Sequence, residues 1–182
     1  NMSKLTFRVW RGERGQGAFE DYTTEVSEGM VVLDALHLIQ AQNANNMAIR
    51  WNCKAGKCGS CSAEINGMPK LMCMTRLNEL NLDMPVIVEP MHAFPPIRDL
   101  VTDVSWNFKV KKSIKKFRPR SPDAPDGTWR MAQADVDRVQ EFRKCIECFL
   151  CQDVCHVLRE HHKHDEFAGP RFFVYTAALE MH

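Results

Sequence analysis

The chain lacks the features that mark membrane-spanning and exported proteins. No run of about 18 apolar residues occurs along its 182 residues, so the sequence predicts no segment that crosses a bilayer. Its beginning, NMSKLTFRVWRG, has neither the apolar core nor the small-residue cleavage site of a secretory signal. The formal net charge of +1 provides no overall attraction to nucleic acid. We therefore expect a protein of a reducing compartment, with a length that suits one or two domains.

Cysteine, by contrast, is abundant, with eight residues in the chain. Without an export signal, this number points to metal binding rather than to disulfides. Four of the cysteines follow the spacing Cys53-x4-Cys58-x2-Cys61-x11-Cys73. This is the plant-type pattern for a [2Fe–2S] cluster, whose two irons need two thiolates each. Gly56 and Gly59 give the loop the backbone freedom that wrapping around a cluster requires.

A structural zinc site is the alternative for these four cysteines. Such sites usually pair two short Cys or His knuckles across a longer gap, and this motif has three cysteines in one loop instead. The iron–sulfur interpretation is therefore the one we adopt.

The other four cysteines follow the spacing Cys145-x2-Cys148-x2-Cys151-x3-Cys155, with His156 where proline usually stands. This run is typical of bacterial ferredoxins, in which the first three cysteines bind one cluster and the fourth binds another. It predicts a [4Fe–4S] centre without its fourth ligand and a third centre with a single ligand.

The missing ligands come either from another chain or from a longer version of this one. The apolar, helix-like ending RFFVYTAALEMH favours a fragment. Ligation by a nearby histidine is a weaker option, and a solvated histidine surface is the more common arrangement. The histidines concerned are His156, His161, His162 and His164.

Residues 1–95 predict a β-grasp domain of the plant-type ferredoxin class. Alternating apolar residues predict strands, an apolar face predicts one helix that Ser27 caps, and Asn66-Gly67 predicts a hairpin turn. The hairpin would bring Cys73 back beside the cysteine loop. The expected strands cover residues 5–9, 19–26, 48–51 and 85–90, and RGERGQG is the expected turn between the first two.

Residues 96–182 predict an all-α domain of the bacterial-type ferredoxin class, which makes the whole chain α+β. Apolar residues at helical spacing predict helices over residues 97–108 and 134–145. Between these helices lies a Pro-rich connector, and residues 109–120 contain seven Lys or Arg. This basic segment either attracts anionic lipid or an acidic partner, or serves as a solvated linker.

The two motifs, their order and their separation together resemble the iron–sulfur subunit of succinate dehydrogenase and fumarate reductase (respiratory complex II). The resemblance covers the whole chain, and the motifs are most similar to those of the actinobacterial-type succinate dehydrogenases. The residues that carry it are RWNCKAGKCGSCSAEINGMPKLMCMTR, FPPIRDLVTDV and EFRKCIECFLCQDVCHVLR.

The resemblance implies a ligand set for three clusters. Cys53, Cys58, Cys61 and Cys73 would bind [2Fe–2S]; Cys145, Cys148 and Cys151 would bind [4Fe–4S]; Cys155 would be one ligand of [3Fe–4S]. A further cysteine motif would complete the last two clusters. No catalytic residue and no substrate site are expected on this chain.

The resemblance also implies partners and a location. A flavoprotein subunit would oxidise succinate at FAD, and a membrane cytochrome b subunit with haem b would bind quinone. Electrons released in pairs at the flavin would pass singly along the clusters to the quinone, which the actinobacterial resemblance suggests is menaquinone. The chain would lie peripherally on the cytoplasmic face of the cell membrane.

Three other functions remain open at this point. A fumarate reductase subunit would run the same chemistry in reverse, a free-standing ferredoxin would carry an acidic docking face and complete ligands, and a zinc module would be colourless. Lys54 and Lys57 add positive charge beside the first motif, which should raise the potential of an anionic cluster, unless they serve only surface solubility.

Overall fold

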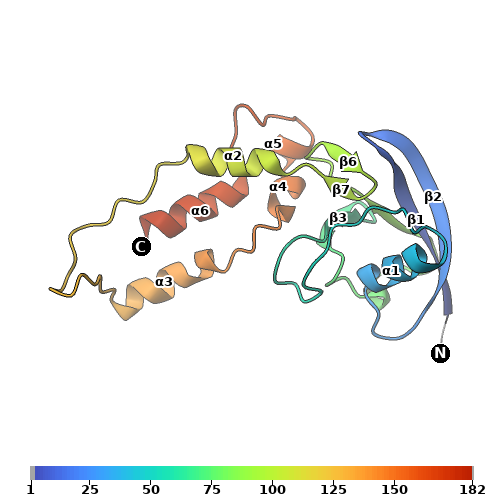
Figure 1. The fold of residues 1–182 in the computed structure, drawn as a ribbon, viewed down its shortest axis with the longest axis horizontal. Helices are drawn as coiled ribbons and strands as arrows, with labels where there is room; N and C mark the ends of the chain where they lie inside the picture. The colour runs from blue at the N-terminus through green and yellow to red at the C-terminus, as the bar shows by residue number, and fades with distance from the viewer. Residues whose placement is uncertain (1–2, 182) are drawn as a thin grey trace.

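The computed structural model describes residues 3–181, in which a sheet-rich part adjoins a helical part (Figure 1). Within these residues, seven strands form one sheet: β1 (Ser3–Glu13), β2 (Gln16–Val26), β3 (Ser62–Ile65), β4 (Met68–Leu71), β5 (Val86–Glu89), β6 (Pro96–Arg98) and β7 (Val101–Thr102). The helices are α1 (Val32–Gln42), the short 3-10 helix η1 (Leu77–Glu79), α2 (Ser105–Ser113), α3 (Gln133–Arg143), α4 (Leu150–Val154), α5 (His156–Arg159) and α6 (Pro170–Glu180).

Strand β1 is the centre of the sheet. It pairs antiparallel with β2 along its whole length and parallel with β5, while β5 pairs with β3 and β3 with β4. The alternation of Leu5, Phe7 and Val9 buries one face of β1, as the sequence predicts. This face carries the main hydrophobic core.

Helix α1 covers the buried face of the sheet (Figure 1). Val32, Leu36 and Ile39 are fully buried against it, which confirms the predicted apolar face. The predicted cap at Ser27 is wrong: the helix begins at Val32, and the Asp34 carboxylate accepts a hydrogen bond from the backbone N–H of Val31 at 3.2 Å.

Two hairpin turns have a left-handed backbone at both central residues. One is the predicted turn at Asn66-Gly67, with φ of 50° and 77°. The other is Arg14-Gly15, with φ of 50° and 82°. Positive φ at both positions matches the twist of the flanking strands. Most of the segment RGERGQG is therefore strand, and only its two central residues form the turn.

The predicted helix over residues 97–108 and the predicted strand over residues 48–51 are wrong, and both errors involve the hydrogen bonds of Asp99. Residues 97–102 form the β6–β7 hairpin rather than a helix, and the helix begins only at Ser105. Asp99 is buried with φ of 45°, and its carboxylate accepts hydrogen bonds from the N–H groups of Gly12 (2.9 Å) and Ala48 (2.8 Å). The Ala48 amide is therefore bonded to Asp99 rather than to a strand, and residues 48–51 have no regular secondary structure. The sheet thus continues past residue 95, to Thr102.

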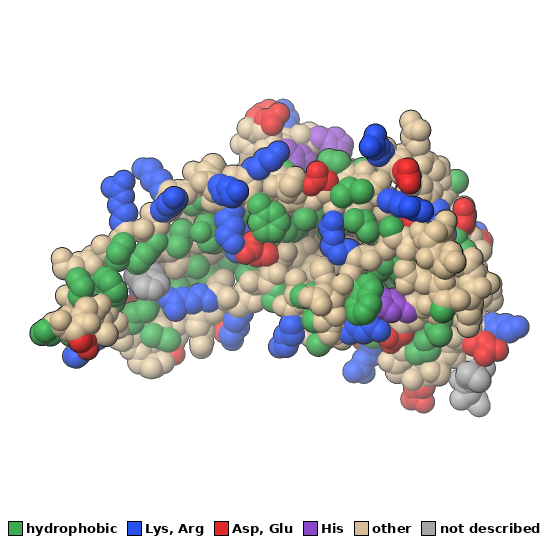
Figure 2. Space-filling model, viewed as in Figure 1, with side chains coloured by type: hydrophobic (Ala, Val, Ile, Leu, Met, Phe, Trp, Pro, Cys, Tyr) green, Lys and Arg blue, Asp and Glu red, His purple; other side chains and the backbone are tan. Residues whose placement is uncertain are grey.

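The helical part extends from the sheet as an arm in which α6 lies between α2 and α3 (Figure 1). Lys111 of α2 places its ammonium 5.2 Å from the ring centre of Tyr175 on α6. Lys and Arg side chains gather along the α2 edge and the following connector (Figure 2). None of the helices within residues 3–181 combines the length and the apolar character that a bilayer span requires.

The position of Asp99 generates a stability prediction. Replacing Asp99 with alanine leaves two half-buried amides without their acceptor and removes the buried partner of the Arg11 ion pair (3.1 Å), so we expect a loss of about 3–5 kcal/mol in the free energy of unfolding. Urea unfolding followed by circular dichroism measures this loss. Asp21→Ala, which breaks an exposed pair with Arg8, is the matched control and should change little. Equal stability of the two variants would contradict this role of Asp99.

Candidate metal centres

The first cysteine motif lies in the loop between α1 and β3 and just after β4. Left-handed φ angles at Lys54 (54°), Gly56 (63°) and Gly59 (70°) curl the loop. The backbone N–H groups of Ala55 and Lys57 consequently both point at Cys53 Sγ, each at 3.3 Å. Amides directed at a sulfur stabilise negative charge on it. The loop therefore suits a thiolate ligand.

The remaining sulfurs of this motif have contrasting environments. A hydrogen bond with Ser60 Oγ at 3.0 Å lowers the pKa of the Cys58 thiol to about 6. Burial raises the pKa of the Cys61 thiol to about 12. Cys61 accepts the Cys73 N–H at 3.4 Å, so the hairpin does return Cys73 to the loop. Binding iron would displace the Cys61 proton and offset the desolvation of its sulfur.

The loop backbone has little room for side chains. A Cβ added at Gly56 would lie 2.9 Å from the Met74 side chain. The four thiols are free, and Cys61 and Cys73 are buried while Cys53 and Cys58 are half-buried. Four thiols, inward amides and a glycine-dependent curl together fit a [2Fe–2S] cluster.

The second motif forms a strained loop followed by α4 and α5. Glu147 and Phe149 have left-handed φ angles of 54° and 61°, which non-glycine residues seldom adopt and which cluster at functional sites. Its four thiols are free as well: Cys145 and Cys151 are exposed, and Cys148 and Cys155 are half-buried. Two of the four cysteines of this motif therefore lie at the surface of the described residues.

The two cysteine loops touch each other. A Cβ added at Gly59 would lie 2.7 Å from Cys148 Cα, so only glycine allows this approach. Ser62 Oγ lies 2.8 Å from the Cys148 carbonyl oxygen and 3.0 Å from that of Gly59, and donates between them. A cavity of about 200 Å³ at this junction is bordered by Cys58 and Cys148 together. Residues 86 positions apart in the sequence thus form one continuous site.

A buried ionic network holds the two parts together beside this junction. Glu64 of β3 has no exposed surface and pairs with Arg159 of α5, which raises the pKa of that guanidinium. Asp153 of α4 accepts the Ala93 N–H at 2.9 Å, and its burial raises its pKa to about 7. His164 lies 2.7 Å from the Ala93 carbonyl oxygen. Both backbone groups of Ala93 are thereby held by the helical part.

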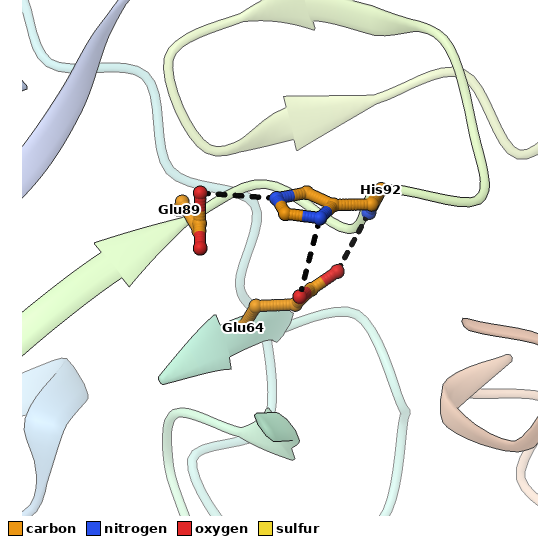
Figure 3. Close-up of side chains that lie close together, drawn as sticks. All are labelled: Glu64, Glu89 and His92. Atoms are coloured by element: carbon orange, nitrogen blue, oxygen red, sulfur yellow. Dashed lines mark hydrogen bonds and ion pairs between the residues drawn. The ribbon is translucent and has the colours of Figure 1, made fainter. Parts of the chain in front are cut away.

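Glu64, Glu89 and His92 converge on one point with the geometry of a cation site (Figure 3). Arg159 already occupies it: its Nη2 pairs with Glu64 and donates to His92 Nδ1 at 2.9 Å. His92 Nε2 then carries the proton and faces Glu89 at 3.0 Å. The guanidinium serves as the cation here, so a metal is not needed.

Sequence reasoning found the cysteines but missed the residues that connect them. The four histidines near the second motif are largely surface residues, since His156, His161 and His162 are exposed and only His164 is half-buried. Ser62, Glu64 and Arg159 carry no motif. The charge of Glu64, just before the predicted hairpin turn at Asn66-Gly67, is the signal that could have indicated a buried partner.

Several known proteins are similar to this chain in sequence or in fold. The family described as 2Fe-2S iron-sulfur cluster binding domain matches residues 6–109. The fumarate reductase iron-sulfur subunit of Mycobacterium tuberculosis is 38% identical over 154 residues, which are 84% of this chain and 61% of that protein. A chain of the solved Mycobacterium smegmatis Sdh1 complex in the apo form is 55% identical, with a TM-score of 0.95 over 100% of this chain and 76% of that one.

The chain belongs to the iron–sulfur subunit family of succinate dehydrogenases and fumarate reductases. The succinate dehydrogenase iron-sulfur subunit of Paracoccus denitrificans is a further relative, 26% identical over 85% of this chain and 60% of its own length. The chain thus spans about three fifths of the two curated relatives. The predicted family, the [2Fe–2S] ferredoxin-type domain and the mixed helix and strand content are confirmed.

The contact between the loops generates a prediction for this iron–sulfur subunit. Gly59→Ala and Gly67→Ala both place alanine at a positive φ, which costs about 1–2 kcal/mol in each case. Only the Gly59 variant also meets backbone atoms, because nothing lies within 4 Å of Gly67. We expect Gly59→Ala to lose clearly more unfolding free energy in denaturant titrations of the metal-free chain. Equal losses would show that the loops do not depend on this close approach.

Proposed function

We propose that this chain is the electron-transfer subunit of a succinate:quinone oxidoreductase. The direct contact of the two cysteine loops at Gly59 and Cys148 is the observation that carries the proposal. Cofactors bound to two touching loops lie close together, and one-electron carriers need that closeness. The family membership supports the same conclusion.

The cysteines would divide among three clusters. We assign Cys53, Cys58, Cys61 and Cys73 to [2Fe–2S], Cys145, Cys148 and Cys151 to [4Fe–4S], and Cys155 to [3Fe–4S]. The strands around α1 suit a β-grasp domain and the remaining helices an all-α ferredoxin domain. Since β6 and β7 belong to the sheet, the boundary fits better after Thr102 than after residue 95.

The residues of the chain would position these groups rather than perform acid–base chemistry. When bound, the clusters accept and release one electron at a time, whereas succinate oxidation releases two together. Backbone amides at Cys53 would stabilise thiolate charge, and Ser62 would keep the two loops at a fixed separation. The buried Cys61 and Cys73 would shield their side of the first centre from water, whereas Cys53 and Cys58 are half-buried.

The partners in this proposal are a flavoprotein subunit with FAD and a membrane cytochrome b subunit with haem b and menaquinone. The chain would then lie on the cytoplasmic face of the cell membrane. The basic segment 109–120 supports a location near an anionic surface, because it carries seven Lys or Arg residues.

The sheet topology predicts which fragment carries the first cluster. Residues 1–104 should fold, turn red-brown and show the rhombic electron paramagnetic resonance (EPR) signal of one reduced centre. Residues 1–95 lack the buried Asp99 and Leu100 and should be far less stable. Iron and sulfide analysis with EPR checks both fragments. A colourless or zinc-loaded longer fragment would contradict the [2Fe–2S] assignment.

Replacing Cys155 with serine tests the direction of electron flow. In the assembled complex, Cys155→Ser should spare succinate oxidation by a dye that takes electrons at the flavin, while quinone reduction is lost. Val154→Ala, at the exposed neighbouring residue, should preserve both activities. The assignment would be wrong if both activities fell together in a complex that remained assembled and flavinylated.

A further inference from the structure

Arg171 is a buried cation next to the second cysteine motif. It lies in the first turn of α6, and its side chain is only 6% exposed. Its backbone N–H donates to Gln152 Oε1 at 3.1 Å, and Gln152 directly follows Cys151. A Cβ at Gly169 would lie 2.2 Å from the same oxygen, so the start of α6 packs tightly against α4. The backbone of Arg171 is therefore held against α4, the helix that contains Cys151.

The guanidinium has few partners for a buried charge. Arg171 Nε and Nη1 are buried without any hydrogen-bond partner among the described residues. Glu147 is its counterion, with a distance of 3.7 Å from Nη2 to Oε1, but Lys111 lies closer to the same oxygen, at 2.6 Å. The ring of Tyr175 adds a cation–π contact at 5.4 Å. A buried cation with free donors is costly unless an acceptor is present.

The missing acceptor has a natural location. Glu147 lies between Cys145 and Cys148, so its ion pair places the guanidinium against the loop that would hold the second cluster. A thiolate-ligated cluster is anionic, and its sulfurs accept hydrogen bonds. Net charge and hydrogen bonds to sulfur are two of the factors that set the reduction potential of such a cluster.

We propose that Arg171 donates its free N–H groups to the sulfurs of the cluster held by Cys145, Cys148 and Cys151, and thereby raises the reduction potential of that cluster. The inference rests on the proposed function, because it requires a cluster at this motif. Reduction adds one electron and one negative charge, which the buried cation favours. Lys111 cannot replace Arg171 in this role, since the Lys111 side chain is 31% exposed and already paired with Glu147.

The test is an EPR-monitored redox titration of the purified complex. In Arg171→Met, we expect the ratio of reduced to oxidised [4Fe–4S] at fixed potential to fall about tenfold, which for one electron is a shift of about 59 mV. Arg171→Lys keeps the charge but loses the forked donors and should shift less. The [2Fe–2S] centre in the same sample is the internal reference and should not move.

Lys111→Met is the matched control, because it removes one positive charge from the same Glu147 and Tyr175. A wild-type potential in Arg171→Met, or an equal shift in Lys111→Met, would overturn the proposal. Loss of the cluster from both Arg171 variants, with [2Fe–2S] retained, would make the residue structural and overturn it too. Absence of [4Fe–4S] from the wild-type complex would instead refute the proposed function.

Discussion

The buried ion pair between Glu64 and Arg159 is the constraint on which the rest of the site depends. Glu64 lies in β3 with no exposed surface, two residues after the Ser62 that bridges the cysteine loops. Arg159 is the last residue of α5, the helix that follows the second motif. Removing Arg159 would leave the fully buried Glu64 carboxylate without its cation, which typically costs about 3–5 kcal/mol, whereas Arg159 is 22% exposed and also pairs with Glu160. The pair therefore selects one relative placement of strand and helix, whatever its net contribution to stability.

That placement explains why the junction depends so strongly on small residues. With β3 and α5 fixed, the Gly59 Cα lies so close to Cys148 that it can carry a hydrogen atom but not a Cβ on that side. Ser62 has a hydroxyl where a longer side chain would separate the loops. The backbones of the two motifs meet directly at this point, beside the cavity bordered by Cys58 and Cys148. The ionic network thus sets the relative orientation of β3 and α5, and the small residues Gly59 and Ser62 allow the two loops to touch.

The sequence predicted the parts of the fold and site that depend on local spacing. Both cysteine motifs, the Asn66-Gly67 hairpin and the apolar face of α1 follow from residue order alone. The helix expected over residues 97–108 failed because Asp99 satisfies amides at Gly12 and Ala48, a long-range effect that helical spacing cannot reveal. The contact of Gly59 with Cys148 was likewise hidden, since it requires the tertiary arrangement of both parts.

Burial decides which charges near the two motifs matter most for electron affinity. Lys54 and Lys57 are exposed, and the Lys54 ammonium lies 5.0 Å from the Trp51 ring centre, so water and salt screen their effect on the first centre. Arg171 is buried, where the effective dielectric constant is lower and the same charge acts more strongly. One buried arginine at the second motif should therefore outweigh two exposed lysines at the first. On the proposal made above for Arg171, a cluster at the second motif would have a higher electron affinity than the cysteine spacing alone would suggest.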